Sequence, residues 1–272
     1  MGRKASRRDE APRRLGPVAA APARQTDRDG RRGEKTRSEE ASSVATLFDD
    51  EGLDRPVREV IPGVVHLPGF LSLEESRALV EQARGLARQV AGTPTAMVRP
   101  EVGAGQMSVY ILSLGYHWQT KPYRYVRSVD GARVPALPEN YQGLVDRVLD
   151  RAAAVSDELS PWRGRMRAET ALVNFYPPGS HMGMHVDGNE ESGAPVVSLS
   201  IGQSALFRMG NPDNRGRPYR DVSLLSGDAI VFGGPARRNY HGIPAVQPGT
   251  TPEGCGLKDG RINITIREVD PH

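Results

Sequence analysis

Apolar residues near position 80 recur at the spacing of one face of a helix. They are Leu79, Val80, Ala83, Leu86, Ala87 and Val90. Ser72 and Glu75 precede them with the spacing of a capping box, in which each side chain satisfies a backbone N–H group of the first turn. Gly92 follows the periodic stretch. The pattern predicts an amphipathic helix over about 72–90 that packs against a sheet.

Shorter periodic signals flank this helix. Residues 59–67 are rich in β-branched side chains around a central Pro62-Gly63, which predicts two short strands joined by a turn. Residues 107–114 have the composition of a strand. After Pro138 the apolar positions return to helical spacing, which predicts a second helix over about 139–155.

The pattern changes to short β-type runs from Met166 onward. Gly, Pro, Asn or Asp separates one run from the next. The runs are 171–176, 196–201, 205–209, 221–225, 228–232 and 261–267. Many short strands at this spacing are typical of a β-sandwich or barrel. We therefore expect an α+β fold that is mainly β.

Residues 1–45 differ from the rest of the chain in composition. They are rich in Arg, Ala, Pro, Gly and Ser, and they have too few large apolar side chains to offset the entropy of ordering, so we expect disorder. They carry 12 Lys and Arg against 7 Asp and Glu, a net charge of +5, whereas the whole chain is +3 and the remainder is therefore −2. This tail is either a contact for phosphates or a solubilising segment.

Cysteine use and hydropathy point to a cellular compartment. The chain has one cysteine, Cys255, so it cannot form an internal disulfide and fits a reducing environment. It has no apolar run of about 18 residues and no apolar secretory segment at its start. We expect a cytoplasmic protein that does not enter a membrane.

The candidate chemistry centres on His185-Val-Asp187. Residues at i and i+2 of a strand point to the same side, so both side chains could reach one metal ion. His241, after the run at 228–232, is a candidate third ligand, and two imidazoles with one carboxylate form the facial triad of non-haem iron sites. His181 competes with His185 as a ligand, and zinc could use the same three residues.

Two arginines lie on the final β-type run, after the candidate metal ligands in chain order. Arg261, Asn263 and Arg267 alternate with isoleucines and therefore share one face of the strand. If the isoleucines face the core, the arginines would be exposed and form surface ion pairs. If the strand lines a cavity, they could clamp a carboxylate ligand bidentately, with Asn174 and Tyr176 donating to the same ligand.

Residues 115–125 concentrate aromatic side chains, although only 6% of the whole chain is aromatic. The cluster comprises Tyr116, Trp118, Tyr123 and Tyr125. Aromatic faces beside basic residues suit the stacking of nucleobases. A hairpin at the edge of the core explains the cluster equally well.

Taken together, these motifs resemble the AlkB family of iron(II)- and 2-oxoglutarate-dependent dioxygenases, over residues 57–269. The matching segments are Asn174-Phe-Tyr176, His185-Val-Asp187, Pro195–Ser200, Gly227–Gly234, Tyr240-His241-Gly242 and Arg261–Arg267. The resemblance implies a double-stranded β-helix (jelly-roll) core with N-terminal helices packed on one sheet and a nucleotide-recognition lid. It implies one domain over 46–272, with the lid at about 105–130 and the catalytic jelly-roll at about 166–269.

The same resemblance implies the cofactors and their positions. Iron(II) would be held by His185, Asp187 and His241. The cosubstrate 2-oxoglutarate would be held by Asn174, Tyr176, Ser198, Arg261, Asn263 and Arg267, and O2 would be the oxidant. The damaged base would be gripped by Trp118 and Tyr123, with Tyr125 beside them. Asn189 stands where the bacterial prototype has an acidic residue that contacts the base, so lesion preference is expected to differ.

The function implied is the oxidative demethylation of N-alkylated bases, of the 1-methyladenine or 3-methylcytosine type, in single- or double-stranded DNA, by a monomer. Demethylation of RNA such as tRNA is the alternative. A non-catalytic nucleic-acid binder and a small-molecule or protein hydroxylase of the same fold are the remaining hypotheses. The negative body charge conflicts with nucleic-acid binding unless a local groove compensates, and its expected residues are Lys121, Arg124, Arg127 and Arg133.

Overall fold

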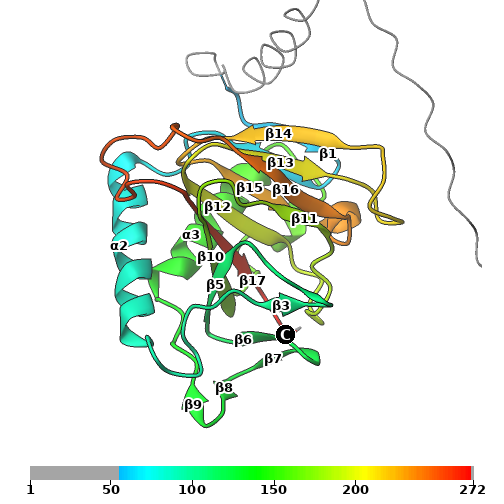
Figure 1. Ribbon diagram of the computed structural model, residues 1–272. Helices are drawn as coiled ribbons and strands as arrows, with labels where there is room; N and C mark the ends of the chain where they lie inside the picture. The colour runs from blue at the N-terminus through cyan, green and yellow to red at the C-terminus, as the bar shows by residue number, and fades with distance from the viewer. Residues whose placement is uncertain (1–54, 271–272) are drawn as a thin grey trace, which may run out of the picture. The chain divides into compact units, whose positions relative to one another are not determined.

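The computed structural model describes residues 55–270, and two antiparallel β-sheets dominate this part of the chain (Figure 1). The expectations of a disordered tail over 1–45 and of a folded start near residue 46 lie outside the described residues. The expectation of one domain over 46–272 therefore stays a prediction.

The larger sheet has seven strands in the order β1-β2-β15-β12-β17-β10-β5. Their bounds are β1 Arg58–Ile61, β2 Val64–Leu67, β5 Tyr110–Leu114, β10 Thr170–Tyr176, β12 Val196–Gly202, β15 Ala229–Phe232 and β17 Arg261–Arg267. Neighbours far apart in sequence pair along most of their length, as β17 does with both β10 and β12. The last strand of the chain thus lies inside the sheet.

The smaller sheet has four strands in the order β11-β16-β13-β14. Their bounds are β11 Met182–His185, β13 Ala205–Met209, β14 Arg220–Leu224 and β16 His241–Val246. A buried apolar cluster that includes Phe207 of this sheet and Ile230 and Phe232 of the larger sheet packs the two together. Two facing antiparallel sheets of this kind confirm the predicted jelly-roll.

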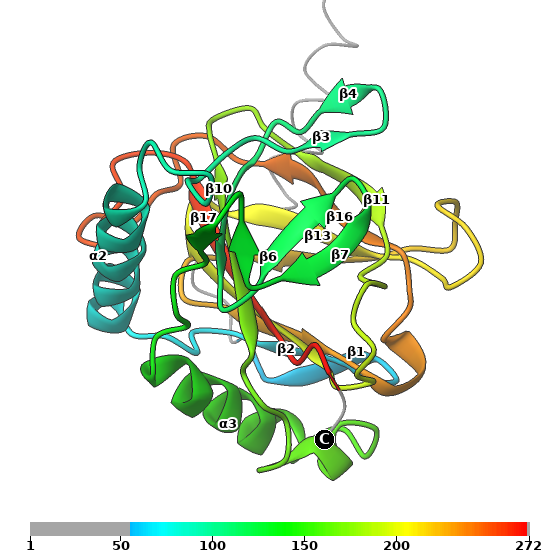
Figure 2. The same ribbon diagram turned by 90° about the horizontal axis from the view of Figure 1, so that it is seen from below.

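Helices α2 (Leu73–Gln89) and α3 (Asn140–Ala152) pack on the outer face of the larger sheet (Figures 1 and 2). Ser72 and Glu75 form the predicted capping box on α2. The apolar positions that predicted the helices, such as Leu79 and Val145, are buried against the isoleucines of β17 and other strand residues. Two short 3-10 helices, η1 (Ser160–Trp162) and η2 (Gly234–Ala236), complete the helical elements of residues 55–270.

Strand β17 separates two environments. Ile262, Ile264 and Ile266 belong to the core beneath the helices, and the intervening residues face the space between the two sheets. The second sheet covers that other face, so Arg261 and Arg267 are only 1% and 5% exposed. The expectation that core-facing isoleucines would leave the arginines exposed is therefore wrong.

A hairpin formed by β6 (His117–Thr120) and β7 (Tyr123–Val126) follows β5, and we call residues 117–126 the lid hairpin. Seen from below, it lies in front of the two sheets (Figure 2), and its aromatic residues line the cavity between them. Gly115 begins this excursion with a positive φ of 75°, and a Cβ there would lie 2.0 Å from the backbone oxygen of Glu169. Only glycine fits at this point.

Two further pairs of very short strands flank the hairpin. They are β3 (Glu101–Val102) with β4 (Gly105–Gln106), and β8 (Ser128–Val129) with β9 (Ala132–Arg133). Val102 of β3 also lines the cavity, which places this pair at its entrance.

Candidate active site

A cavity of about 720 Å³ opens between the two sheets. Its floor comes from β10, β12 and β17, its opposite wall from β11 and β16, and its entrance from the lid hairpin. The residues proposed from the sequence for the metal, the carboxylate ligand and the base all line this single cavity. The fold therefore brings together candidate site residues that are spread over about 150 positions of the sequence.

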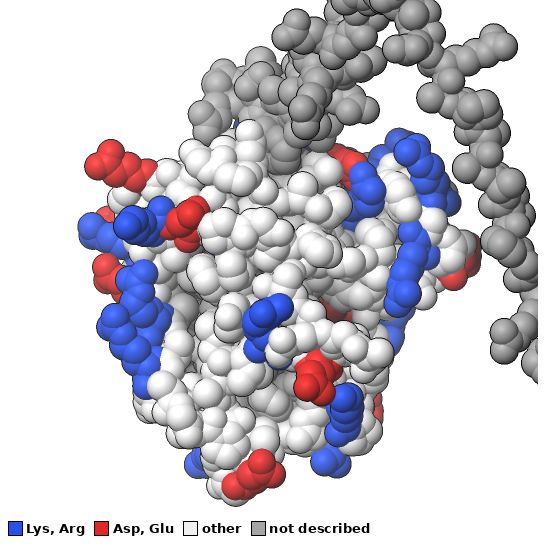
Figure 3. All heavy atoms as spheres, in the orientation of Figure 1, with Lys and Arg blue, Asp and Glu red and all other residues white. Residues whose placement is uncertain are grey.

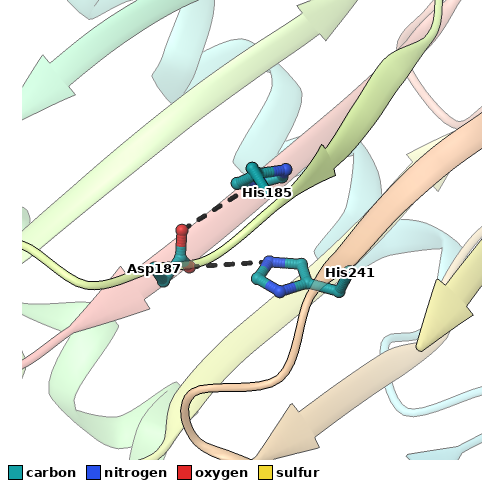
Figure 4. A group of neighbouring side chains, drawn as sticks. All are labelled: His185, Asp187 and His241. Carbon is teal, nitrogen blue, oxygen red and sulfur yellow. Dashed lines mark ion pairs between the residues drawn. The ribbon is translucent and has the colours of Figure 1, made fainter. Parts of the chain in front are cut away.

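His185, Asp187 and His241 converge on one point (Figure 4). Their ligand atoms all lie within 4.8 Å of one another, with Asp187 Oδ1 3.7 Å from His185 Nε2 and Asp187 Oδ2 3.8 Å from His241 Nε2. His185 ends β11 and His241 begins β16, and the two residues face each other across this strand pair. The three side chains could hold one metal ion.

Backbone carbonyls contact both imidazoles of the candidate metal site. The Nδ1 atom of His185 lies 2.9 Å from the oxygen of Gly183, and that of His241 lies 3.1 Å from the oxygen of Asn239. An Nδ1–H that donates to a carbonyl leaves the Nε2 lone pair free for a metal. Burial, together with the nearby His185, lowers the pKa of His241 to about 4, so this imidazole is neutral at physiological pH.

Asp187 lies beyond the end of β11, in a loop (residues 186–194) that we call the Asp187 loop. The sequence predicted that His185 and Asp187 lie on one strand. His185 does, but the strand ends there, so Asp187 does not. Arg267 donates to Asp187 Oδ2 from Nε at 3.0 Å and from Nη2 at 2.5 Å. Burial would raise the pKa of Asp187, but Arg267 and the two imidazoles outweigh it and hold this pKa well below its usual range.

Arg261 presents a contrasting environment. It is fully buried on the same face of β17, yet no carboxylate among residues 55–270 pairs with it. Its Nε donates to Ser200 Oγ at 3.0 Å, its guanidinium lies 4.9 Å from the Tyr176 ring centre, and its Nη1 has no hydrogen-bond partner in the described part of the chain. Burial lowers the pKa of this group. A buried cation without a counter-ion is the complement of a carboxylate ligand.

Polar side chains from three strands surround the space between Arg261 and the metal-binding residues. Asn263 Nδ2 donates to Ser198 Oγ at 2.6 Å, and Asn174 Nδ2 donates to Asn263 Oδ1 at 3.1 Å. The Oδ1 atom of Asn174 is buried without a partner in the described residues. Thr265 Oγ1 also donates to Asn263, at 2.7 Å. This ladder offers hydrogen bonds to a ligand that reaches from Arg261 toward the metal.

The donor set fits a dicarboxylate oxo acid bound beside iron. The three candidate metal ligands lie close together on the wall of the same cavity that Arg261 lines. Arg261 would hold a distal carboxylate, at the end of the ladder of polar residues.

The aromatic residues of the lid hairpin stand at the cavity entrance. Trp118 and Tyr123 stack with ring centres 6.0 Å apart and planes 29° from parallel. Trp118 Nε1 also donates to Asn189 Oδ1 at 3.2 Å, which ties the lid hairpin to the Asp187 loop. Tyr125 is turned inward, and its hydroxyl donates to Glu190 Oε1 at 2.6 Å. The cluster is a hairpin, as one of the two interpretations expected, and it lines the cavity; the stacking of nucleobases on it stays a prediction.

Comparisons with known proteins agree with this geometry. Residues 63–267 match the 2OG-Fe(II) oxygenase superfamily. An AlkB homologue of Caulobacter vibrioides, named an alpha-ketoglutarate-dependent dioxygenase, is 35% identical over 211 residues, covering 77% of this chain and 89% of the relative. This protein belongs to the AlkB family of 2OG-Fe(II) oxygenases.

Other members of the AlkB family extend the comparison. Escherichia coli AlkB is 32% identical over 64% of this chain and 76% of its own length. The Arabidopsis thaliana DNA N(6)-methyladenine demethylase ALKBH1C is 29% identical over 76% of this chain, and the match spans 48% of the plant protein. The solved structure of OsALKBH1 superimposes with a TM-score of 0.68 and 26% identity, covering 78% of this chain and all of that chain.

Family membership settles the cofactor chemistry. The protein is a 2-oxoglutarate-dependent dioxygenase that uses iron(II), 2-oxoglutarate and O2, and the zinc alternative is set aside. His181, the rival metal ligand, is exposed in a loop, where its backbone exchanges hydrogen bonds with Ser108. Within residues 55–270, no helix combines the length and apolar character needed to cross a membrane.

Sequence reasoning missed several buried polar residues around the site. Ser200 and Thr265 contact Arg261 and Asn263, and their alternation with Ser198 and Asn263 on facing strands was the available signal. Glu190 of the Asp187 loop and Arg237 form a buried ion pair, with Nη2 and Oε2 3.0 Å apart. No pattern in the sequence distinguished these two from ordinary surface charges.

Proposed function

We propose that this protein removes N-linked alkyl groups from nucleobases of DNA, with 1-methyladenine and 3-methylcytosine as the substrate type. The observation that carries the proposal is the arrangement of one cavity. It holds a candidate iron site in its interior and a stacked aromatic pair, Trp118 and Tyr123, at its entrance. A planar ligand that enters past the aromatic pair is led toward the metal.

The metal ligands in this proposal are His185, Asp187 and His241. Bound iron(II) with 2-oxoglutarate and O2 supplies the oxidising chemistry that hydroxylates the alkyl carbon, and the hydroxylated product loses formaldehyde. The chain itself orients the reactants. Arg261 holds one carboxylate of the cosubstrate, and Arg267 holds Asp187 in the orientation that binds metal.

The lid hairpin selects a base that has left the helical stack. An alkyl group on the pairing edge weakens base pairing and lowers the cost of extruding that base. Aromatic side chains then stack on it irrespective of its sequence context. Asn189, which accepts from Trp118 at 3.2 Å, stands beside the entrance with an amide that can both donate and accept. We propose that Asn189 contacts the base edge.

The test is formaldehyde release. Purified protein with iron(II) and 2-oxoglutarate is incubated with single-stranded and duplex oligonucleotides that carry 1-methyladenine, 3-methylcytosine or N6-methyladenine. We expect release from the first two, and none from Asp187→Ala. Absence of release from every methylated oligonucleotide, with 2-oxoglutarate turnover intact, would falsify the proposal.

RNA is the second candidate substrate. Relatives of this chain include a protein of Schizosaccharomyces pombe named as a tRNA demethylase, 31% identical over 57% of this chain. Matched DNA and RNA oligomers with the same lesion and sequence decide between the two. If kcat/KM is higher on the RNA oligomer than on the DNA oligomer, RNA is the preferred substrate and the DNA assignment is wrong.

Two other hypotheses are separated by variants. A binder without catalysis would keep its cellular function in Asp187→Ala, whereas an enzyme would lose it. A hydroxylase of proteins or small molecules would not need Trp118, so Trp118→Ala would leave its turnover intact.

A further inference from the structure

Arg237 is an almost fully buried arginine that binds the Asp187 loop at three points. It lies in the segment between η2 and β16, four residues before His241. Its Nη1 donates to the backbone oxygen of Asp187 at 2.7 Å, and its Nε donates to the oxygen of Ala194 at 2.7 Å. Its Nη2 pairs with Glu190 Oε2 at 3.0 Å. One guanidinium therefore holds the start, the middle and the end of this loop.

Glu190 carries the connection onward to the lid hairpin. Its second carboxylate oxygen accepts the Tyr125 hydroxyl at 2.6 Å and lies 3.6 Å from Arg267 Nε. Tyr125 belongs to β7, and Arg267 binds Asp187 directly. A continuous, largely buried chain of contacts thus runs from the lid hairpin through Glu190 to both the carboxylate and the backbone of Asp187.

The placement of this ion pair matters more than its strength. A buried salt bridge contributes little net stability compared with apolar packing, because desolvating both charges offsets their attraction. Arg237 and Glu190 are 4% exposed each, and the guanidinium directs two of its three donor nitrogens to loop carbonyls. A planar guanidinium with several donors holds its acceptors in fixed relative positions, and buried arginines are suited to this role.

We propose that Arg237 and Glu190 are positioning residues that hold the Asp187 loop and the lid hairpin as one unit, so that the position of the lid hairpin and the placement of the Asp187 carboxylate are coupled. The proposal rests on the metal site of the proposed function and is independent of which alkylated polymer is the substrate. Its tests use metal affinity and hydrogen exchange, which need no nucleic acid, so failure of the demethylation assay leaves them interpretable.

The first experiment measures metal binding. Co(II) is titrated into metal-free wild type, Arg237→Gln and Arg237→Lys, and the affinity is read from the visible absorption of bound Co(II). Loss of a group that orients a metal ligand costs about 10- to 100-fold in affinity. We expect that loss in Arg237→Gln, and also in Arg237→Lys, because an ammonium cannot donate to three separated acceptors.

Arg208→Gln is the matched control, since Arg208 pairs with Asp221 on the smaller sheet, away from the Asp187 loop. Its Co(II) affinity should equal that of wild type. If Arg237→Gln or Arg237→Lys lowers the melting temperature but binds Co(II) as wild type does, Arg237 is merely structural and the proposal fails.

The second experiment tests the link to the lid hairpin with a change of one hydroxyl. Tyr125→Phe removes the hydrogen bond to Glu190, whereas Tyr123→Phe removes a hydroxyl from an exposed residue of the same strand. We expect Tyr125→Phe to speed amide hydrogen exchange in both segments, 117–126 and 187–190. Tyr123→Phe should leave exchange in 187–190 unchanged. Faster exchange confined to 117–126 in Tyr125→Phe would show that the two segments move independently.

Discussion

Arg261 and Arg267 lie six residues apart on one strand, and their electrostatic surroundings are opposite. Arg267 is bound to Asp187 by two hydrogen bonds, and the attraction raises its pKa. Arg261 is equally buried, but it has no carboxylate partner among the described residues, and burial lowers its pKa. The first arginine binds Asp187 of the candidate metal site, and the second is available to a ligand.

This contrast predicts that replacing Arg261 has opposite effects with and without cosubstrate. Arg261→Met removes an unpaired buried charge, so the ligand-free variant should be at least as stable as wild type. Wild type should gain about 2.7 kcal/mol at a 2-oxoglutarate concentration about 100 times its Kd, and the variant should gain almost none. Thermal unfolding with and without 2-oxoglutarate measures both effects.

Arg208→Met, at a partly exposed pair, should keep the full response to 2-oxoglutarate. A stabilisation of Arg261→Met equal to that of wild type would exclude Arg261 as the cosubstrate anchor.

Asp187→Ala should be destabilised even without metal. The substitution leaves Arg267 buried, with Glu190 at 3.6 Å as its remaining counter-charge among the described residues. Breaking a buried pair from one side costs about 3–5 kcal/mol. Adding Arg267→Met to Asp187→Ala should recover part of that loss. Urea unfolding of the three proteins without metal checks this, and a double variant less stable than Asp187→Ala would contradict it.

At the scale of elements, Asp228 joins strands that are distant in sequence. It precedes β15 and is completely buried, and its carboxylate accepts from the backbone N–H groups of Gly69 and Leu225, both at 2.9 Å. His66 Nε2 on β2 lies 2.9 Å away, and Arg55 also pairs with it. Burial alone would raise the pKa of Asp228, but His66 and Arg55 outweigh it, so the pKa lies below its usual value.

A lowered pKa in the folded state means that Asp228 stabilises the fold above about pH 4, and that this contribution is lost as pH falls through the lowered pKa. Asp228→Asn should therefore be less stable than wild type by about 3 kcal/mol at about pH 7, and the difference should shrink in acid. Urea unfolding at neutral pH and in acid measures it. Asp221→Asn, at a partly exposed pair, should cost under about 1 kcal/mol at either pH. A difference for Asp228→Asn that is the same at both pH values would contradict this account.

The lid hairpin predicts a separation of binding from chemistry. Trp118→Ala removes a stacking surface worth about 1–3 kcal/mol, so KM for methylated DNA should rise roughly 5- to 150-fold. The metal and the cosubstrate do not depend on Trp118, so 2-oxoglutarate turnover without DNA should change little. Equal losses in both assays would assign Trp118 to the fold and not to the substrate.

The sequence predicted most elements but not those around the metal. Helices α2 and α3 and the apolar strands were found, because helical spacing and β-branched runs are local signals. The bounds of β11 and β16 could not be found from periodicity, since glycine, methionine and proline interrupt their pattern, although His185 was expected on a strand. The burial of Arg261 could not be decided from β17 alone, because it depends on the sheet that covers the opposite face. The Glu190–Arg237 pair depends on contacts between loops, which leave no periodicity.

At the scale of the whole molecule, charge is distributed unevenly. On the face drawn in Figure 3, basic side chains gather at separate edges around a largely uncharged area. The expected groove is partly occupied by internal partners, because Lys121 pairs with Glu101 and Arg127 binds the Tyr116 hydroxyl. Arg124 likewise donates to Gln119. Of these three residues only Lys121 has a carboxylate partner in the described part of the chain, whereas Arg124 and Arg127 bind neutral groups that do not cancel their charge near the lid hairpin.

The basic segment 1–45 lies outside the described residues, but its net charge of +5 supports a prediction. Deleting it should weaken DNA binding mainly at low salt. The dependence of log K on log salt should fall by about 0.7 for each single-strand phosphate that the segment neutralises in the full-length protein. Activity on a short oligonucleotide at saturating concentration should persist. Titrations at several salt concentrations measure the slope, and an unchanged slope would make the segment a solubilising tail.

The central position of β17 has a consequence for how the enzyme is made. Strands β10 and β12 are joined only through β17, which is the last of the described strands to be synthesised. The same strand supplies both arginines of the site. A nascent chain that has not yet released Arg261–Arg267 thus has neither a continuous larger sheet nor the proposed anchor for the cosubstrate. Completion of folding and acquisition of activity are therefore one step, and premature termination before β17 should leave no folded but inactive enzyme to compete for the substrate.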